Sequence, residues 1–198
     1  MQNDPSSPSP ASPPPAPAAS RGLLRTLVSG LLIAAAVGLV VHWGVDEARR
    51  VKLVHGGKPA PAFSLQKFGG GTVSLAGLKG KVVMLDFWAT WCPPCRAEMP
   101  DLTRLAKEYE SKGLVFVAAN RDDAETQKVE VGMFVDKLPA LGPSVAFADD
   151  AMSDAYRIEV LPTMYFIGKQ GEILDAYTSY ASESTLRDRI ERALAEAK

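Results

Sequence analysis

The chain has 198 residues, of which 46% are hydrophobic and 23% are charged, and its net charge is −1 at pH 7. This length and composition fit one globular domain with smaller segments attached, and the near-neutral charge gives no reason to expect a nucleic-acid partner. Only two cysteines and two histidines are present, which excludes a disulfide-rich scaffold and argues against a structural zinc site with its usual four ligands.

Two segments precede the globular part of the chain. Residues 1–22 are rich in proline, serine and alanine, a composition typical of a disordered tail. Residues 23–45 are predicted to form a transmembrane anchor, because the 17 residues from Leu27 to Trp43 are mostly apolar and would span about 25 Å as a helix, near the lower limit for a bilayer. A cleavable signal peptide is the alternative, but no small-x-small cleavage site follows Trp43.

The cationic residues around the anchor bear on its orientation. Arg21 lies before the anchor and Arg25 at its start. The cationic residues after it are Arg49, Arg50, Lys52 and Lys58. Counting these residues alone favours a cytoplasmic C-terminal domain, although the charge rule is weak for long domains.

A polar linker is predicted at residues 46–58 and one domain at residues 59–198. The domain opens with apolar–polar alternation on both sides of Gly69-Gly70-Gly71, which predicts a β-hairpin. Strands are expected at 81–89, 114–119, 144–148, 164–167 and 173–177, and helices at 93–111, 124–138, 149–156 and 183–197, the last capped by Ser182. This order predicts an α/β domain with a mixed central sheet flanked by helices.

The motif with chemical content is Trp91-Cys92-Pro93-Pro94-Cys95, which lies between a predicted buried strand and a predicted helix. A cysteine at a helix N-terminus lies beside unpaired amides, and these together with the helix dipole favour its thiolate. The thiolate is the form that attacks disulfides. The motif therefore predicts thiol–disulfide exchange.

The segment VMLDFWATWCPPCRAEMP at residues 83–100 resembles the active-site segment of the thioredoxin superfamily, and most of all the TlpA/ResA-like membrane-anchored thiol–disulfide oxidoreductases of bacteria. The resemblance extends to PAPAFSL at 59–65 and to LPTMYFI at 161–167, and it covers about residues 58–197. It implies a thioredoxin-like fold with an N-terminal β-hairpin extension.

The resemblance also implies roles for individual residues. Cys92 would be the exposed attacking thiol and Cys95 the buried resolving thiol of a redox-active disulfide. The residues expected to bind substrate are Trp91, Pro93, Leu161 and Pro162, with a cis peptide bond before Pro162.

Two acidic residues are further candidates for catalysis. Glu98 matches a glutamate that influences dithiol protonation in ResA-like proteins, and the alternative is a surface glutamate in the first helical turn. Asp86 matches the buried aspartate of thioredoxins, where many TlpA-like relatives carry asparagine. A carboxyl inside an apolar strand should have a raised pKa, which suits a proton acceptor for Cys95; the alternative is a structural, hydrogen-bonded aspartate.

The expected function is that of an inner-membrane, single-pass enzyme with its catalytic domain in the periplasm or otherwise outside the cytoplasm. It would reduce disulfides of exported clients such as apocytochrome c, be recharged by a membrane thiol or electron carrier, and need no cofactor or metal. A peroxiredoxin-like peroxidase is an alternative, but the Pro-x-x-x-Thr-x-x-Cys loop is absent. A copper-delivery module is another, but its cysteines are spaced by three residues and no histidine follows His55.

Overall fold

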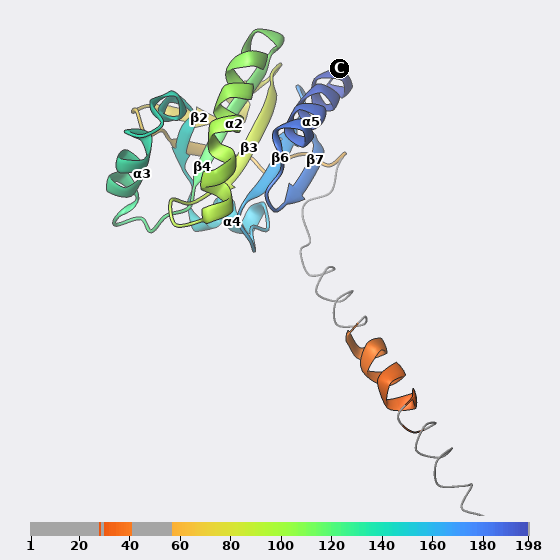
Figure 1. Cartoon of the computed structure of the whole chain (residues 1–198). Coiled ribbons are helices and arrows are strands. Elements are labelled where there is room, and N and C mark those ends of the chain that lie inside the picture. The colour runs from red at the N-terminus through yellow and green to blue at the C-terminus, as the bar shows by residue number, and fades with distance from the viewer. Residues whose placement is uncertain (1–27, 29, 41–56, 198) are drawn as a thin grey trace, which may run out of the picture. The chain divides into compact units, whose positions relative to one another are not determined.

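The computed structural model describes residue 28, residues 30–40 and residues 57–197. The chain divides into two compact units, Met1–Arg50 and Val51–Lys198, and each is treated by itself. In the first unit, residues 30–40 are helical (Figure 1). These residues are exposed. No helix in the described part of the chain is long and apolar enough to cross a membrane. The predicted tail, both ends of the predicted anchor and all but the last two linker residues lie outside the described residues.

The second unit begins with the predicted hairpin. Strand β1 (Ser64–Gln66) pairs antiparallel with β2 (Thr72–Ser74), and Ser64 lies opposite Ser74. In the connecting turn Gly70 and Gly71 both have positive φ, at 92° and 76°. Only glycine adopts this backbone conformation without steric cost, and the glycine run therefore determines where the chain reverses.

The main sheet has five strands in the order β5-β4-β3-β6-β7. Their bounds are β5 Val145–Phe147, β4 Leu114–Asn120, β3 Val82–Trp88, β6 Thr163–Ile167 and β7 Ile173–Thr178. Strands β3, β4 and β5 are parallel, whereas β6 and β7 are antiparallel to their neighbours. The mixed α/β architecture expected from the sequence is confirmed.

Strand β3 lies at the centre of the sheet, and all seven of its residues are buried. Side chains alternate along a strand, so Val82, Met84 and Trp88 belong to the core on one face, and Val83, Leu85 and Phe87 to the core on the other. By the same alternation, Asp86 points to the face of Met84 and Trp88. Its carboxyl therefore lies on the face that is covered by α2 (Pro93–Tyr109) and α5 (Glu183–Glu196) (Figure 1).

The opposite face is covered by the β1–β2 hairpin and α4 (Asp150–Ala155). Short 3-10 helices are η1 Ala76–Leu78, η2 Glu110–Lys112 and η3 Pro139–Ser144. The predicted cap of the last helix is confirmed, since the Ser182 side chain accepts a hydrogen bond from the Thr185 amide at the start of α5.

The prediction is least accurate around residues 121–144. Helix α3 occupies only Gln127–Val135 rather than 124–138. At its start, the Asp123 carbonyl accepts hydrogen bonds from the amides of Thr126 and Gln127, which closes a turn before the helix. At its end, Leu138 has φ −139° and ψ 68°, because the residue before a proline is disfavoured in the helical region. Pro139 then begins η3, which was not predicted.

Candidate functional site

The two cysteines lie where β3 meets α2. Strand β3 ends at Trp88, a short loop follows, and Cys92 is the N-cap of α2. The first helical positions are Pro93 and Pro94, which need no amide partner there and have a backbone preset for the helix. The Cys92 sulfur accepts a hydrogen bond from the Cys95 amide at 3.3 Å. The predicted placement of this sulfur at a helix N-terminus is confirmed.

Cys92 and Cys95 form a disulfide, with their Cα atoms 5.3 Å apart. Cys95 is fully buried, as expected. The expected exposure of Cys92 is wrong for this form, in which its sulfur is bonded to Cys95 and the residue is only 3% exposed. The adjacent Trp91 is 64% exposed. An exposed indole beside a closed disulfide leaves an apolar surface at the point where another thiol or disulfide must approach. The structure is that of the oxidised form of the motif.

The other segment matched from the sequence lies at the same end of the sheet. The Leu161–Pro162 peptide bond is cis, and β6 begins at the next residue, Thr163, which lies opposite Phe87 of β3. Pro162 is buried, Leu161 is partly buried and Val160 is exposed. The expected cis peptide bond is confirmed, but nothing in the structure tests substrate binding by Trp91, Pro93, Leu161 or Pro162.

Asp86 is fully buried, and neither of its carboxylate oxygens has a hydrogen-bond partner among the described residues. Burial raises the pKa of Asp86 well above its usual value, and the negative charge of Glu98 raises it further. The described residues therefore supply no hydrogen-bond partner for the structural alternative, and the catalytic role of Asp86 stays a prediction. The raised pKa would make an ionised Asp86 a stronger proton acceptor than an exposed aspartate.

Glu98 is 1% exposed, so the alternative that Glu98 is a surface glutamate is wrong. Its carboxylate accepts a hydrogen bond from the Ala181 amide at 3.1 Å, which links α2 to the turn before α5. Burial raises the pKa of Glu98 to about 7, although this hydrogen bond opposes the rise. Glu98 can therefore gain or lose a proton near neutral pH.

Tyr177 is a member of this site that sequence reasoning missed. In the sheet register Asp86 lies opposite Met164, and Met164 lies opposite Tyr177, so the three residues form a row across β3, β6 and β7. The Tyr177 hydroxyl is buried with no hydrogen-bond partner in the described part of the chain. Burial raises its pKa, and the charges of Glu98 and Asp86 add to the rise. No local sequence signal marks Tyr177, because the row depends on strand pairing.

The loop before Cys92 is held by a second set of polar residues, here called the Asp122 clamp: Thr90, Asn120, Asp122 and Glu130. The Thr90 amide donates to Asp122 Oδ1 at 2.9 Å, and the Thr90 hydroxyl donates to Glu130 Oε2 at 3.2 Å. Asn120 and Asp122 exchange two further hydrogen bonds of 3.0 and 3.1 Å. The clamp fixes the backbone two residues before Cys92.

The Asp122 clamp was also missed from the sequence. A usable signal was present, since Asn120 and Asp122 come at the end of a buried strand parallel to β3, and the carboxyl ends of neighbouring parallel strands meet at one edge of the sheet.

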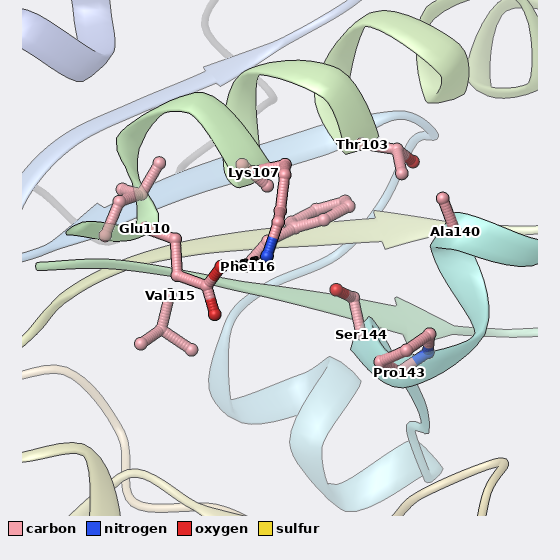
Figure 2. Close-up of a pocket in the computed structure, with 10 residues that line it drawn as sticks. Thr103, Lys107, Glu110, Val115, Phe116, Ala140, Pro143 and Ser144 are labelled. Atoms are coloured by element: carbon pink, nitrogen blue, oxygen red, sulfur yellow. Dashed lines mark hydrogen bonds and ion pairs between the residues drawn. The ribbon is translucent and has the colours of Figure 1, made fainter. Parts of the chain in front are cut away.

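A cavity of about 530 Å³ lies away from the disulfide, between the second half of α2, β4 and η3. Figure 2 shows Lys107 and Glu110 reaching toward each other beside it, and their charged atoms are 2.7 Å apart. No residue from Trp91 to Glu98 lines this cavity, and it takes no part in the site. Among the described residues there is also no group of three or more potential metal ligands of the His, Cys, Asp or Glu type.

Comparison with known proteins agrees with this geometry. Residues 56–176 match the AhpC/TSA family. The thiol-disulfide oxidoreductase ResA of Oceanobacillus iheyensis is 37% identical over 158 residues, covering 78% of this chain and 79% of that protein. ResA of Bacillus subtilis is 32% identical over 158 residues, covering 80% and 86%.

Solved structures agree as well. A thiol:disulfide interchange protein of the thioredoxin family from Chlorobium tepidum superposes with a TM-score of 0.63 at 28% identity, covering 71% of this chain and 98% of that one. The fold is thioredoxin-like, with the hairpin β1–β2 added before it. The chain therefore belongs to the AhpC/TSA family and is a thiol–disulfide oxidoreductase of the ResA type.

Proposed function

We propose that this enzyme is a membrane-anchored, extracytoplasmic reductase of disulfides in exported client proteins, such as apocytochrome c. The observation that carries the proposal is the Cys92–Cys95 pair at the N-terminus of α2, beside an exposed tryptophan and above two buried acids. The apolar run from Leu27 to Trp43 and the exposed apolar side chains of the helix at 30–40 support the anchor.

The proposed reaction moves two electrons from the protein dithiol to the client. The Cys92 thiolate attacks one sulfur of the client disulfide, forms a mixed disulfide and releases the first client thiolate, which takes a proton from solvent. Cys95 then gives its proton to the Asp86–Glu98 pair, and its thiolate attacks the Cys92 sulfur. The internal disulfide forms, and the second client thiolate leaves and takes up a proton from the Asp86–Glu98 pair or from solvent. A membrane thiol or electron carrier returns two electrons and two protons to the oxidised pair.

Client contact is proposed at Trp91, Pro93, Leu161 and Pro162. The exposed indole of Trp91 supports an apolar contact. Thr163, two residues after Leu161, pairs with Phe87 near the end of β3, which supports a contact by the Leu161 backbone. A proline at 162 has no amide hydrogen to donate toward a thiolate.

The defining test is mixed-disulfide trapping with the full-length chain. Cys95→Ser should accumulate a covalent complex with a disulfide-bonded client, because the resolving thiol is gone. Cys92→Ser should not, because the attacking thiol is gone. Equal trapping by both single variants would contradict the assignment, and turnover of hydrogen peroxide faster than of protein disulfides would favour a peroxidase instead.

The proposed location is tested by a reporter fused after Lys198. The Lys and Arg count around the anchor opposes an exported domain, so this test is decisive. A reporter that is active only in the extracytoplasmic compartment supports the proposal, and one that is active only in the cytoplasm contradicts it.

A further inference from the structure

A second cavity, of about 500 Å³, opens beside the disulfide, between the first half of α2 and residues 134–138. Its apolar lining comes from Pro93, Ala97 and Pro100 of α2, together with Phe134 and Leu138. The Phe134 ring packs against the buried Trp88 with ring centroids 5.2 Å apart. Phe134 and Leu138 are packed against the core, whereas Pro93, Ala97 and Pro100 are exposed.

Two cations, Arg96 and Lys137, complete the lining of this cavity. Both side chains are exposed, and neither has an ion pair or hydrogen bond with any described residue. The other cations of α2 differ, since Arg104 pairs with Asp101 and Glu183, and Lys107 pairs with Glu110. An apolar cavity lined also by two unpaired cations is complementary to an apolar side chain next to an acidic one.

The position of the cavity relates it to the chemistry. Pro93 directly follows Cys92, and Pro100 is eight positions after Cys92 in the same helix. At about 1.5 Å per residue this is about 12 Å along the helix axis, the length of three to four residues of extended chain at about 3.3 Å each. A peptide whose cysteine is bonded to Cys92 therefore reaches across the whole cavity within about four residues.

We propose that this cavity, here called the Arg96–Lys137 subsite, binds the client segment next to the reacting cysteine and selects an apolar residue accompanied by an acidic one within about four positions. The inference rests on the proposed reductase function and deepens it, because it names a chemical class of client sequence. It shares only Pro93 with the substrate-binding residues expected from the sequence. The electrostatic part should act mainly on the encounter rate and should weaken with added salt.

The test uses the reduced full-length chain in non-ionic detergent and short peptides with one cysteine carried as a mixed disulfide with thionitrobenzoate. Cys92 attacks the peptide sulfur, and thionitrobenzoate leaves as a coloured thiolate. Each peptide has a leucine and one test residue, which is glutamate, glutamine or lysine, within four residues of the cysteine. In one set these two residues precede the cysteine, and in the other set they follow it. The measured quantity is the second-order rate constant of thiolate release.

In at least one set, wild type should react fastest with the glutamate peptide, more slowly with the glutamine peptide and slowest with the lysine peptide. The differences between these rate constants should shrink as the salt concentration rises. Arg96→Gln with Lys137→Gln should slow the glutamate peptide about threefold to tenfold, as expected for two exposed charges, and leave the glutamine peptide nearly unchanged. Arg96→Glu with Lys137→Glu should reverse the order. Lys128→Gln, on the exposed surface of α3 and outside the cavity, is the matched control and should keep the wild-type order.

The apolar part of the subsite has its own measurement. Replacing leucine by alanine in the glutamate peptide should slow wild type, and Ala97→Trp, which fills the cavity, should remove that difference. Equal rates for all peptides, or a charge order that survives the double glutamate variant, would overturn the subsite while leaving the reductase function intact. Failure to reduce any peptide would overturn the proposed function and the subsite with it.

Discussion

Asp86 and Glu98 are two buried carboxyl groups, and the charge of Glu98 acts on Asp86. Both have a raised pKa, chiefly because burial penalises the ionised form, and the charge of Glu98 raises the pKa of Asp86 further. Like charges at close range disfavour double ionisation, so the pair titrates jointly rather than as two independent acids. The pKa of Tyr177 is raised chiefly by burial and further by the charges of Glu98 and Asp86.

This arrangement makes stability depend on pH. Glu98 has a pKa of about 7 in the folded protein against 4.5 when unfolded, so between these values the folded state binds more protons than the unfolded state. The free energy of unfolding therefore falls as pH rises from about 5 to 7, by at most about 3 kcal/mol from this residue.

Glu98→Gln is expected to remove most of that decline. The amide oxygen can still accept the Ala181 hydrogen bond, whereas the buried charge is gone, so the variant should be more stable than wild type at pH 8 by about 1–3 kcal/mol and closer to it at pH 5. Urea denaturation of the oxidised protein at both pH values measures this. An identical decline in the two proteins would show that folding does not raise the pKa of Glu98.

Asp86→Asn is expected to slow the second half of the reaction. The change keeps the shape of the side chain but removes one acceptor for the Cys95 proton, so decay of a preformed Cys92 mixed disulfide should slow by at least about tenfold near neutral pH. The thiol titration should also become simpler, and the fold should gain stability, since Asp86 is buried without a partner. Unchanged decay and titration would make Asp86 structural only.

At the scale of elements, the active-site loop depends on β4 and α3 as much as on its own strand and helix. The Asp122 clamp joins Thr90 to the end of β4 and, through Glu130, to α3. The first half of α2 and the segment after α3 also form the two sides of the Arg96–Lys137 subsite. A shift of α3 would therefore move the loop before Cys92 and the subsite together.

Asp122→Ala should destabilise the oxidised protein by about 1–3 kcal/mol, because it leaves the Thr90 amide and the buried Asn120 side chain without their acceptor. Denaturation in urea measures the loss, and the rate of Cys92 alkylation in the reduced protein reports any change at the loop. Asp123→Ala is the matched control, since Asp123 is the exposed neighbour. Among the described residues, its carboxylate accepts one hydrogen bond, from the nearby Glu125 amide. Equal losses for both variants would contradict a specific role of the clamp.

At the scale of the whole molecule, the catalytic unit carries its own core on both faces of the sheet. Its first described residues join the sheet edge, since the Ile173 amide donates to the Lys58 carbonyl at 2.8 Å and the Ala60 amide donates to the Gly171 carbonyl at 2.8 Å. The predicted boundary near residue 58 therefore retains these contacts.

Residues 58–198 expressed alone should show one cooperative thermal transition, because both core clusters of the described residues are built from Ala60 onward. A shorter form that starts at Ala62 should melt at a lower temperature, since it loses both backbone hydrogen bonds. Calorimetry of the two forms makes the comparison. A broad, non-cooperative transition in the longer form would place the boundary further toward the N-terminus.

The sequence alone was sufficient for features that depend on neighbouring residues. The glycine run predicted the hairpin turn, the continuous apolar run predicted the central strand, and Ser182 predicted the start of α5. The strand, cysteines and prolines in one stretch predicted a sulfur at a helix N-terminus. Each of these rests on local backbone preference, side-chain period or capping, which act within a few residues.

Only the tertiary structure decided how distant residues combine. Glu98 is buried because α2 packs beside a turn that lies 83 residues away in sequence, and Tyr177 joins the acids through pairing of three strands. The Asp122 clamp and the Arg96–Lys137 subsite likewise require α2, α3 and β4 to meet. A residue's burial and charged neighbours depend on packing between elements, so its local sequence cannot specify them, and here they raise the pKa of both Asp86 and Glu98.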